Sequence, residues 1–356
     1  MYDIAVIGLG PAGAVFAKAL SSEFKVVAID KKGQCSDFKK TCGGLLSPDA
    51  QKLLKKLDIT LSDSVILNRQ FPSVKTFALD SENIKSYSRD YVNIDRHLFD
   101  MELISHIPSN VDIKSNSRCS KIVRTPHGFD IFYISEGTEN MISARCIVGA
   151  DGAASIVRRT LFPDKKIRRY VAIQQSFDLT DGNFEQSYSC IFDPENTDCY
   201  AWSLSKDDRF ILGGAFPAEN CRNRFESLKE KMKAYGFEYG KLINTEACLV
   251  LRPSSFKDFC TGSDNAFLIG EAAGFISPSS LEGISSGILS GKLLAEVLNS
   301  SSGSPNKKYH RATRTLRIKI TLKLLKCPFM YNSAIRNLVM KSGLLTVNTD
   351  KKDDTK

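Results

Sequence analysis

The stretch YDIAVIGLGPAGAVFAKALSSEFKVVAID occupies residues 2–30 and decides the fold. It begins with an apolar run, Tyr2–Ile7, that suits a buried strand, and a glycine-rich turn follows over residues 8–13. An alanine-rich pattern typical of a helix continues to Leu20, and a second apolar run ends at Asp30. This order predicts a strand–helix–strand unit with parallel strands, as in a doubly wound α/β domain.

The glycine turn has the spacing G-x-G-x-x-G in the context that phosphate binding requires, with a strand before it and a helix after it. Gly8 permits the tight turn, Gly10 lets a phosphate approach the backbone, and Gly13 lets the helix pack closely on the strand. The helix N-terminus offers free N–H groups to phosphate oxygens, and the Asp30 carboxylate can accept hydrogen bonds from a ribose. We therefore predict dinucleotide binding, against the alternative of a chance glycine-rich turn. The expected binding residues of this unit are Gly8, Gly10, Pro11, Ala12, Gly13, Asp30 and Lys31.

Two further glycine turns follow apolar runs much later in the chain. One reads RCIVGADG over residues 145–152, and the other reads AFLIGEAAG over residues 266–274. Either alone would be an ordinary connection between a strand and a helix. Three such turns, all at strand ends, fit one domain assembled from distant segments. The helix pattern after the third turn repeats glycine every four residues, at Gly283, Gly287 and Gly291, which predicts close packing against a neighbouring helix.

The region between the second and third turns has a different pattern. Its β-rich stretches, joined by short polar connections such as residues 205–208, predict an antiparallel sheet and hence a separate domain. A charged helix is expected over residues 224–235, and a Gly/Ser-rich linker over residues 300–305. The expected strands cover residues 170–179, 188–192, 199–204, 210–216 and 247–252.

These patterns predict a fold of the α/β class. A doubly wound, Rossmann-like nucleotide-binding domain carries an inserted, mainly antiparallel substrate domain and a basic C-terminal segment. The predicted boundaries are 1–75, 90–165 and 262–300 for the discontinuous first domain, 76–89 and 166–261 for the substrate domain, and 306–345 for the segment.

The composition is that of an ordinary globular protein, with 42% hydrophobic and 25% charged residues. These values exclude a disordered or collagen-like chain, and no run reaches 18 apolar residues, so we expect no transmembrane helix. The first residues lack the basic region of a secretory signal. The ten cysteines include no C-x-x-C pair and the four histidines are scattered. We therefore expect reduced thiols, no metal site and a cytoplasmic location.

The charge of the chain is concentrated near one end. The formal net charge is +9, and residues 297–349 hold ten Lys and Arg but no Asp or Glu, so the rest is close to neutral. From Leu316 to Leu324 apolar residues alternate with polar ones, a period of two that favours a strand over a helix. We predict peripheral contact with an anionic membrane through residues 307–341; the alternative is a docked element with a solvated basic face. We expect no nucleic-acid partner.

The three turns, in this order, resemble the p-hydroxybenzoate-hydroxylase-type flavoproteins. Within them the resemblance is to the geranylgeranyl-reductase-like branch, and in particular to the bacterial CbrA family, over residues 1–345. The stretches that carry it are KTCGGL at 40–45, NIDRHLFD at 93–100, GADGA at 149–153, YAW at 200–202 and GEAAGF at 270–275. The resemblance also implies a helix, not a strand, for the basic segment.

What the resemblance implies first is FAD as the cofactor, with its ADP half on Gly8, Gly10, Gly13 and Asp30. Glu271 occupies a position where the family usually has Asp, whose carboxylate receives a ribityl hydroxyl. The longer Glu side chain can still accept that bond. The other residues that the resemblance assigns to the cofactor are Arg96 near the ribityl-pyrophosphate, Asp151 and Gly152 of the second turn, and Gly270 and Gly274 of the third.

The resemblance also suggests where the chemistry occurs. Cys42, Gly43 and Gly44 are the catalytic candidates, in a loop over the flavin ring; the alternative for Cys42 is an ordinary buried thiol. Tyr200 and Trp202 are expected to wall an apolar substrate pocket, or else to belong to the core. The helix after Glu271 is expected to direct its N-terminus at the flavin.

The function implied is an FAD-dependent oxidoreductase of the geranylgeranyl-reductase-like type. It would reduce carbon–carbon double bonds of an isoprenoid or other apolar, lipid-like substrate by hydride transfer from reduced flavin, with NADH or NADPH as the external donor. Three alternatives share the sequence features: a flavin-dependent aromatic monooxygenase, an NAD-dependent dehydrogenase, and a non-enzymatic flavin-binding protein.

Overall fold

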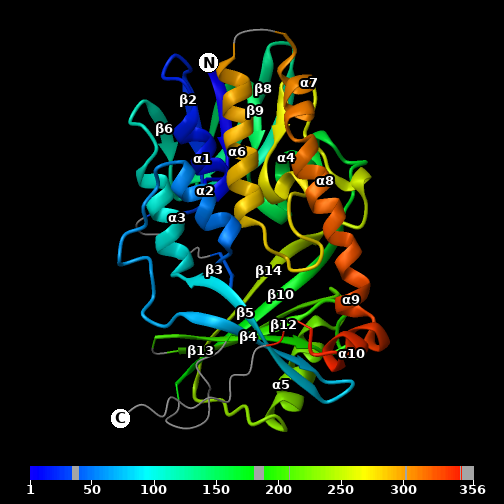
Figure 1. Ribbon diagram of the computed structural model, residues 1–356. Coiled ribbons are helices and arrows are strands. Elements are labelled where there is room, and N and C mark those ends of the chain that lie inside the picture. The colour runs from blue at the N-terminus through cyan, green and yellow to red at the C-terminus, as the bar shows by residue number, and fades with distance from the viewer. Residues whose placement is uncertain (34–39, 180–187, 208, 301–302, 345, 347–356) are drawn as a thin grey trace.

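The computed structural model describes residues 1–33, 40–179, 188–207, 209–300, 303–344 and 346. Two sheets dominate the molecule, one in the upper half of Figure 1 and one in the lower half. A parallel sheet with helices on it and a second, mainly antiparallel sheet confirm the predicted α/β class. The helices are α1 (Pro11–Ala19), α2 (Pro48–Lys56), α3 (Arg96–Ser105), α4 (Ile156–Leu161), α5 (Cys221–Lys233), α6 (Ile284–Asn299), α7 (Pro305–Ala312), α8 (Arg314–Leu322), α9 (Cys327–Tyr331) and α10 (Ser333–Lys341).

The first sheet contains the predicted strand–helix–strand unit. Its parallel strands run in the order β6-β2-β1-β9-β15, and β7 and β8 extend it as an antiparallel hairpin along the first half of β9. The three glycine turns follow β1, β9 and β15, so they meet at one edge of this sheet, as parallel strands require. The strands are β1 (Tyr2–Ile7), β2 (Val26–Ile29), β6 (Val111–Lys114), β7 (Ser117–Thr125), β8 (Gly128–Ser135), β9 (Thr138–Gly149) and β15 (Ala266–Leu268).

The central strands are buried on both faces, which explains their nearly continuous apolar sequences. Alternate residues of β1 enter different cores because successive side chains point to opposite sides of a sheet. Val6 packs in the core that holds Leu294 of α6, whereas Ile7 packs in the core that holds Leu316 of α8. The C-terminal segment therefore covers one face of this first sheet, which belongs to the nucleotide-binding half of the molecule.

Helices α1 and α6 approach each other at their glycines. A Cβ at Gly291 would overlap the carbonyl oxygen of Ala12, and one at Gly287 would lie 3.5 Å from the Ala12 Cβ. Gly283 precedes α6 and faces Ile276 instead. The predicted close packing thus holds for two of the three glycines.

The second sheet has the order β14-β10-β13-β12-β11-β4-β5-β3, and only its β11–β4 pair is parallel. Helix α5 covers it with Phe225, Leu228 and Met232, which are all fully buried. The predicted boundaries 75/76 and 89/90 fall inside β4 and β5, which form one hairpin. The strands are β3 (Leu45–Leu46), β4 (Phe71–Ala78), β5 (Asn83–Asn93), β10 (Arg168–Asp178), β11 (Tyr188–Phe192), β12 (Ala201–Lys206), β13 (Arg209–Phe216) and β14 (Leu242–Arg252).

The basic C-terminal segment is helical, as the family resemblance implied and against the period of two in its sequence. A helix divides such alternating apolar residues between two faces: Leu316 and Ile320 are buried, whereas Ile318 and Leu322 are exposed. Packing of the first pair on the nucleotide-binding half decides the conformation. Of the predicted linker and hairpin, residues 301–302 and Asp208 lie outside the described residues.

The segment fastens the two halves of the molecule together, as its course along the side of Figure 1 shows. At one end, the Tyr309 hydroxyl donates to the Leu268 carbonyl oxygen over 3.1 Å. At the other, buried Arg336 pairs with Asp80 at 2.6 Å, in the second sheet's hairpin connection. Within the described ranges, no helix is both long and apolar enough to cross a membrane.

Replacement of Gly291 by alanine should destabilise the fold, because the new methyl group would overlap the Ala12 carbonyl oxygen. Such a clash costs about 1–3 kcal/mol of unfolding free energy. Gly287→Ala is the matched control, since its methyl group would make an ordinary contact and alanine gains about 0.5–1 kcal/mol in a helix. Urea unfolding compares the two; equal midpoints would contradict close packing at Gly291.

Candidate functional site

The first glycine turn is built around an open space in front of α1. A Cβ at Gly8, whose φ is +98°, would lie 2.7 Å from the Ala150 carbonyl oxygen, and one at Gly13 would overlap the Gly8 carbonyl oxygen. Gly10 is different, because a Cβ there would meet no described atom within 4 Å. Gly8 and Gly13 are therefore required by packing, whereas Gly10 leaves its surroundings free for an approaching group.

The N-terminus of α1 faces this space. The helix begins at Pro11, and among the described residues no side chain caps it. Its first N–H groups and its dipole therefore favour an anion. The Ala12 methyl group points elsewhere, toward Gly270 and Gly287, so the predicted role of Ala12 at this turn falls to its backbone.

Asp30 ends β2 as predicted, and its carboxylate is deeply buried. It accepts hydrogen bonds from the backbone N–H groups of Leu9 and Lys32, the latter at 2.6 Å, and lies 3.3 Å from the Lys32 ammonium. Lys31 is exposed, whereas Lys32 is buried. Lys31 is the expected binding residue, and the structure brings Lys32 to Asp30 in addition, because alternation along an extended chain places residues 30 and 32 on the same side.

Lys32 also connects Asp30 to the start of α3. Its ammonium lies 3.7 Å from Asp100, whose carboxylate accepts a hydrogen bond from Arg96 Nε at 3.0 Å. Burial opposes the charged form of Arg96, but the Asp100 carboxylate overrides this and raises the pKa of the guanidinium. Arg96 is thus a permanent cation beside the loop that holds Cys42.

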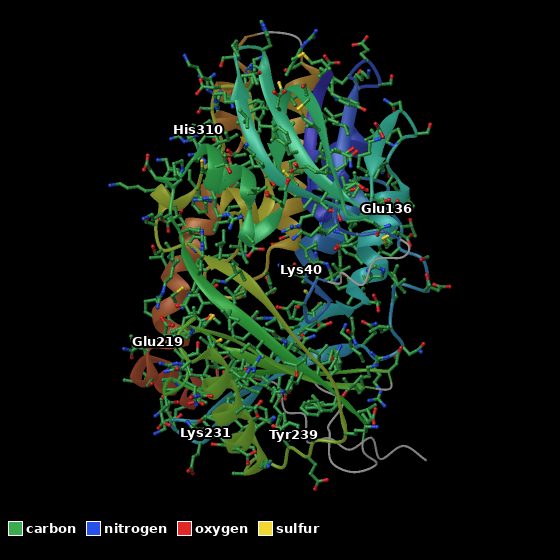
Figure 2. The ribbon with its side chains drawn as sticks, turned by 180° about the vertical axis from the view of Figure 1, so that it is seen from behind. Lys40, Glu136, Glu219, Lys231, Tyr239 and His310 are labelled. Carbon is green, nitrogen blue, oxygen red and sulfur yellow. The ribbon has the colours of Figure 1, made fainter. Side chains whose placement is uncertain are left out.

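A second cation, Lys40, lies between the two halves of the molecule, where Figure 2 labels it. Its neighbours include Glu271 of the third glycine turn and Cys248 of β14. Burial acts to lower the pKa of Lys40, but Glu271, together with the thiols of Cys248 and Cys42, raises that pKa overall. Lys40 was part of the motif that carried the family resemblance, yet only the fold brings it to Glu271.

Glu271 joins the two halves through its carboxylate. Oε1 accepts the backbone N–H of Leu251 in β14 at 2.9 Å. Oε2 lies toward Gly152, 3.9 Å from the position of a Cβ there. One oxygen is therefore engaged by the second sheet, and the predicted bond to a ribityl hydroxyl falls to the other.

The Asp151 carboxylate serves the helix that follows it. Oδ2 accepts the backbone N–H groups of Ile156 and Val157, at 2.6 and 3.4 Å, at the start of α4. Oδ1 is buried and has no hydrogen-bond partner among the described residues. Burial raises the pKa of this carboxyl group. Beyond the predicted support of a cofactor, Asp151 thus caps α4 and retains one free acceptor.

The third turn places its two glycines differently. Gly270 has a φ of +58°, donates its N–H to Ser290 Oγ at 2.9 Å, and adjoins Ala12 at the first turn. Gly274 has a φ of +86° and packs toward Ile167, away from Ala12. Gly270 is therefore at the meeting point of the turns, and Gly274 has the role of ending its own turn.

The catalytic candidates lie in a loop that packs over β12. A Cβ at Gly44, where φ is +65°, would lie 2.5 Å from the Ile94 carbonyl oxygen, so only glycine fits without strain. A Cβ at Gly43 would lie 3.8 Å from the indole of Trp202. Cys42 Sγ accepts the Gly44 N–H at 3.4 Å. The loop thereby places Gly43 against the predicted substrate wall; residues 34–39, which precede it, lie outside the described residues.

Tyr200 and Trp202 belong to an aromatic wall on the second sheet. Their ring centroids are 5.9 Å apart, and the indole lies on Gly213, where any Cβ would come within 2.6 Å of the ring. The buried Tyr200 hydroxyl donates to the Ser280 carbonyl oxygen at 2.6 Å. Tyr91 donates to Glu282 at 2.6 Å in the same connection to α6. The aromatic wall consists of Tyr91, Tyr188, Tyr200 and Trp202.

The amine of Lys206 lies beside the loop of Gly43 and Gly44, and the sequence pattern did not indicate it. Lys206, at the end of β12, donates from Nζ to the Ile94 carbonyl oxygen at 2.6 Å and to Asn93 Oδ1 at 3.2 Å. It also lies where a Cβ on Gly44 would be. Burial lowers the pKa of Lys206 to about 8, so its proton becomes available near neutral pH. No local pattern could have revealed this, because the burial depends on distant segments.

The described residues contain no group of three His, Cys, Asp or Glu side chains that could hold a metal ion. The nine cysteines that they include are all free thiols.

Comparison with known proteins establishes the family. The family model described as lycopene cyclase protein matches residues 3–320. Protein CbrA of Escherichia coli O9:H4 (strain HS) is 49% identical over 345 residues, which cover 96% of this chain and 94% of the relative. This chain belongs to the CbrA family. Protein CbrA of Escherichia coli K12 is 48% identical with similar coverage, 96% and 97%, and the matching model places the chain in the lycopene cyclase protein family as well. The resemblance found in the sequence is confirmed.

Solved structures share the fold of this CbrA family member at low sequence identity. A geranylgeranyl bacteriochlorophyll reductase-like protein from Thermoplasma acidophilum has a TM-score of 0.69 at 18% identity, over 98% of this chain and 88% of that one. PqsL, a probable FAD-dependent monooxygenase from Pseudomonas aeruginosa, has a TM-score of 0.69 at 17% identity, over 96% and 99%. Likeness at this level shows that the architecture is shared.

Replacement of Glu271 by leucine should weaken the attachment of β14, because the buried Leu251 N–H loses its acceptor. The expected loss is about 1–3 kcal/mol of unfolding free energy. Glu271→Gln is the matched control, since its amide oxygen can still accept. Hydrogen exchange at Leu251 provides a local measure: equal protection in both variants and in the wild type would contradict the assigned bond.

Proposed function

We propose that this protein is an FAD-dependent oxidoreductase that reduces a carbon–carbon double bond of an isoprenoid or similar apolar, lipid-like substrate. The observation that carries the proposal is the open space at Gly10, in front of the uncapped N-terminus of α1, beside two glycines that packing requires. That arrangement is suited to a pyrophosphate.

The residues at the junction of the two halves fit the remainder of FAD. Asp30 lies at the end of β2 for the adenosine ribose, and Arg96 and Lys40 supply positive charge for an anionic dinucleotide. Glu271 Oε2 and the free Asp151 Oδ1 offer hydrogen-bond acceptors. FAD, when bound, supplies the transfer of two electrons and a proton between a donor such as NADH or NADPH and the substrate.

An apolar substrate is supported by the side chains of the second sheet. The aromatic wall supplies apolar rings beside Gly43, although Tyr200 itself belongs to the core, and its hydroxyl groups at Tyr91 and Tyr200 are already engaged by Glu282 and Ser280. The family description names lycopene, and the description of a protein with a similar fold names geranylgeranyl bacteriochlorophyll. Both molecules contain an isoprenoid chain.

Lys206 is the proposed acid, which would protonate the carbon atom of the double bond that receives no hydride. Its ammonium lies at Gly44, and Lys206 ends the strand that carries Trp202, so it can hold a proton there in a partly desolvated position. Its lowered pKa, about 8, suits an acid that must release that proton at neutral pH.

The purified protein tests the proposal directly. It should be yellow, release FAD on denaturation, and be bleached by NADH, NADPH or dithionite without oxygen. An isoprenoid lipid with an allylic double bond should then restore the colour and gain two hydrogens by mass. A colourless protein contradicts FAD binding. Substrate-linked oxygen consumption with oxygen in the product would identify a monooxygenase instead, and a flavin that no lipid reoxidises would identify a binding protein.

Substitution of Gly10 by aspartate should abolish FAD retention, because a carboxylate would occupy the space proposed for the pyrophosphate. The fold should survive, since the backbone φ of Gly10 is −69° and no described atom lies within 4 Å of a Cβ there. FAD content and thermal unfolding of the apoprotein measure the two effects. Gly10→Ala, which adds a methyl group without charge, should retain part of the FAD; wild-type FAD content in the aspartate variant would contradict the assignment.

The rate of substrate reduction should fall as the pH rises through about 8, because Lys206 then loses its proton. Lys206→Met should remove this pH limb and slow the step, whereas bleaching of the flavin by the donor should be unchanged. Lys206→Arg keeps the charge and should move the limb to higher pH. Stopped-flow measurement of the two half-reactions decides; an unchanged pH profile in the methionine variant would exclude Lys206 as the acid.

A further inference from the structure

The C-terminal segment exposes a continuous row of large apolar side chains. Ile318, Leu322, Leu325 and Phe329 are 42%, 55%, 66% and 55% exposed, and together we call them the apolar stripe. Their spacings of four, three and four residues place them on one face of the helical run from α8 to α9.

The opposite face of the same run is already occupied. Leu316 and Ile320 are buried against the nucleotide-binding half, and Arg317 stacks on Phe256 at 4.9 Å. The apolar stripe is therefore not needed for packing within this chain. In Figure 1 helices α8 and α9 run along the outer side of the molecule, past both sheets. Leu338, which is 71% exposed on α10, continues the apolar character beyond the stripe.

Positive charge surrounds the stripe. Arg314, Lys319 and Lys326 are exposed on the same helical run, and the exposed Arg311 precedes it. Residues 297–349 contain ten Lys and Arg and no Asp or Glu. An apolar row with basic side chains beside it is the arrangement that lies in the interface of an anionic bilayer.

We propose that the apolar stripe and its basic neighbours dock on the surface of an anionic lipid bilayer. Charge complementarity selects this occupant. A second copy of the chain would bring two such basic surfaces together, and a nucleic acid would leave four large apolar side chains without a partner.

The docked surface leads toward the aromatic wall. Tyr331, at the end of α9, donates to the Ser279 carbonyl oxygen at 2.5 Å, and Tyr200 of the wall donates to the next carbonyl, Ser280, at 2.6 Å. Docking would therefore bring the bilayer close to the place where an apolar substrate is expected. That link rests on the proposed function, whereas binding to the bilayer does not.

Co-sedimentation with vesicles tests the docking on the full chain, with FAD content recorded in parallel. Vesicles of phosphatidylcholine with 30% phosphatidylglycerol should bind the protein at low salt, and binding should weaken as salt rises. Vesicles of phosphatidylcholine alone should bind it far less. No binding to the anionic vesicles at low salt overturns the proposal, whatever the FAD content.

Two sets of substitutions separate charge from apolar contact. Lys319→Glu, Lys323→Glu and Lys326→Glu together should lower vesicle affinity at least about a hundredfold. Leu322→Ser, Leu325→Ser and Phe329→Ser should lower it by a similar factor while leaving the attraction dependent on salt. FAD content and thermal unfolding should match the wild type in both sets, because these side chains are outside the core.

The matched controls lie on other surfaces. Lys52→Glu, Lys55→Glu and Lys56→Glu make the same charge change on exposed positions of α2, and Met141→Ser removes an apolar side chain that is 54% exposed on β9. Both should bind vesicles far better than the segment variants. Equal losses in controls and segment variants would contradict a defined docking surface. A dimer in solution that the stripe variants dissociate would show instead that this face joins two copies.

Discussion

Ala12 of α1 is the residue on which the nucleotide-binding half depends. Gly270 of the third turn and Gly287 and Gly291 of α6 all approach it so closely that side chains would collide or touch. One turn earlier, Gly8 lies against Ala150 of the second turn. Interiors pack like crystals, so these contacts fix how segments far apart in the sequence meet at one edge of the sheet. The open space at Gly10 exists because its neighbours are held there.

Single polar side chains take part in the junction between the two halves, beside the apolar contacts of Leu251 with Ala153 and Ile276. Glu271 holds β14 through Leu251, Lys206 holds the Ile94 backbone, and Tyr200 holds the connection to α6 through Ser280. Each of these groups is at least partly removed from water, so loss of its partner is costly. The same groups border the proposed site. The same bonds therefore shape the proposed site and help to position the two sheets, which explains why a binding residue here can also be a structural one.

The C-terminal segment packs against both halves of the molecule, and only its inner face takes part in that packing. Tyr309 and Arg336 anchor it at the two ends through Leu268 and Asp80, and its inner face completes a core. Its outer face keeps apolar side chains that folding does not require. An amphipathic helix normally turns its polar side outward. Here apolar and basic side chains share the outer side, an arrangement that fits a partner with both apolar and anionic groups.

The sequence by itself determined the strand–helix–strand unit and the roles of Gly8 and Gly13, because turn, strand and helix signals act over a few residues. It also determined the class of the second sheet and the helix α5, whose patterns are local. Only the tertiary structure decided that Lys32 meets Asp30, that Glu271 gives one oxygen to β14, and that Lys206 lies beside Gly44. These contacts join residues that are far apart in the chain or depend on the direction of a side chain, so the sequence does not reveal them. The C-terminal segment is a second case in which the local pattern was not sufficient. Its alternating pattern favoured a strand, but packing of Leu316 and Ile320 on the first sheet selected the helix. Burial against a partner outweighs a weak local preference.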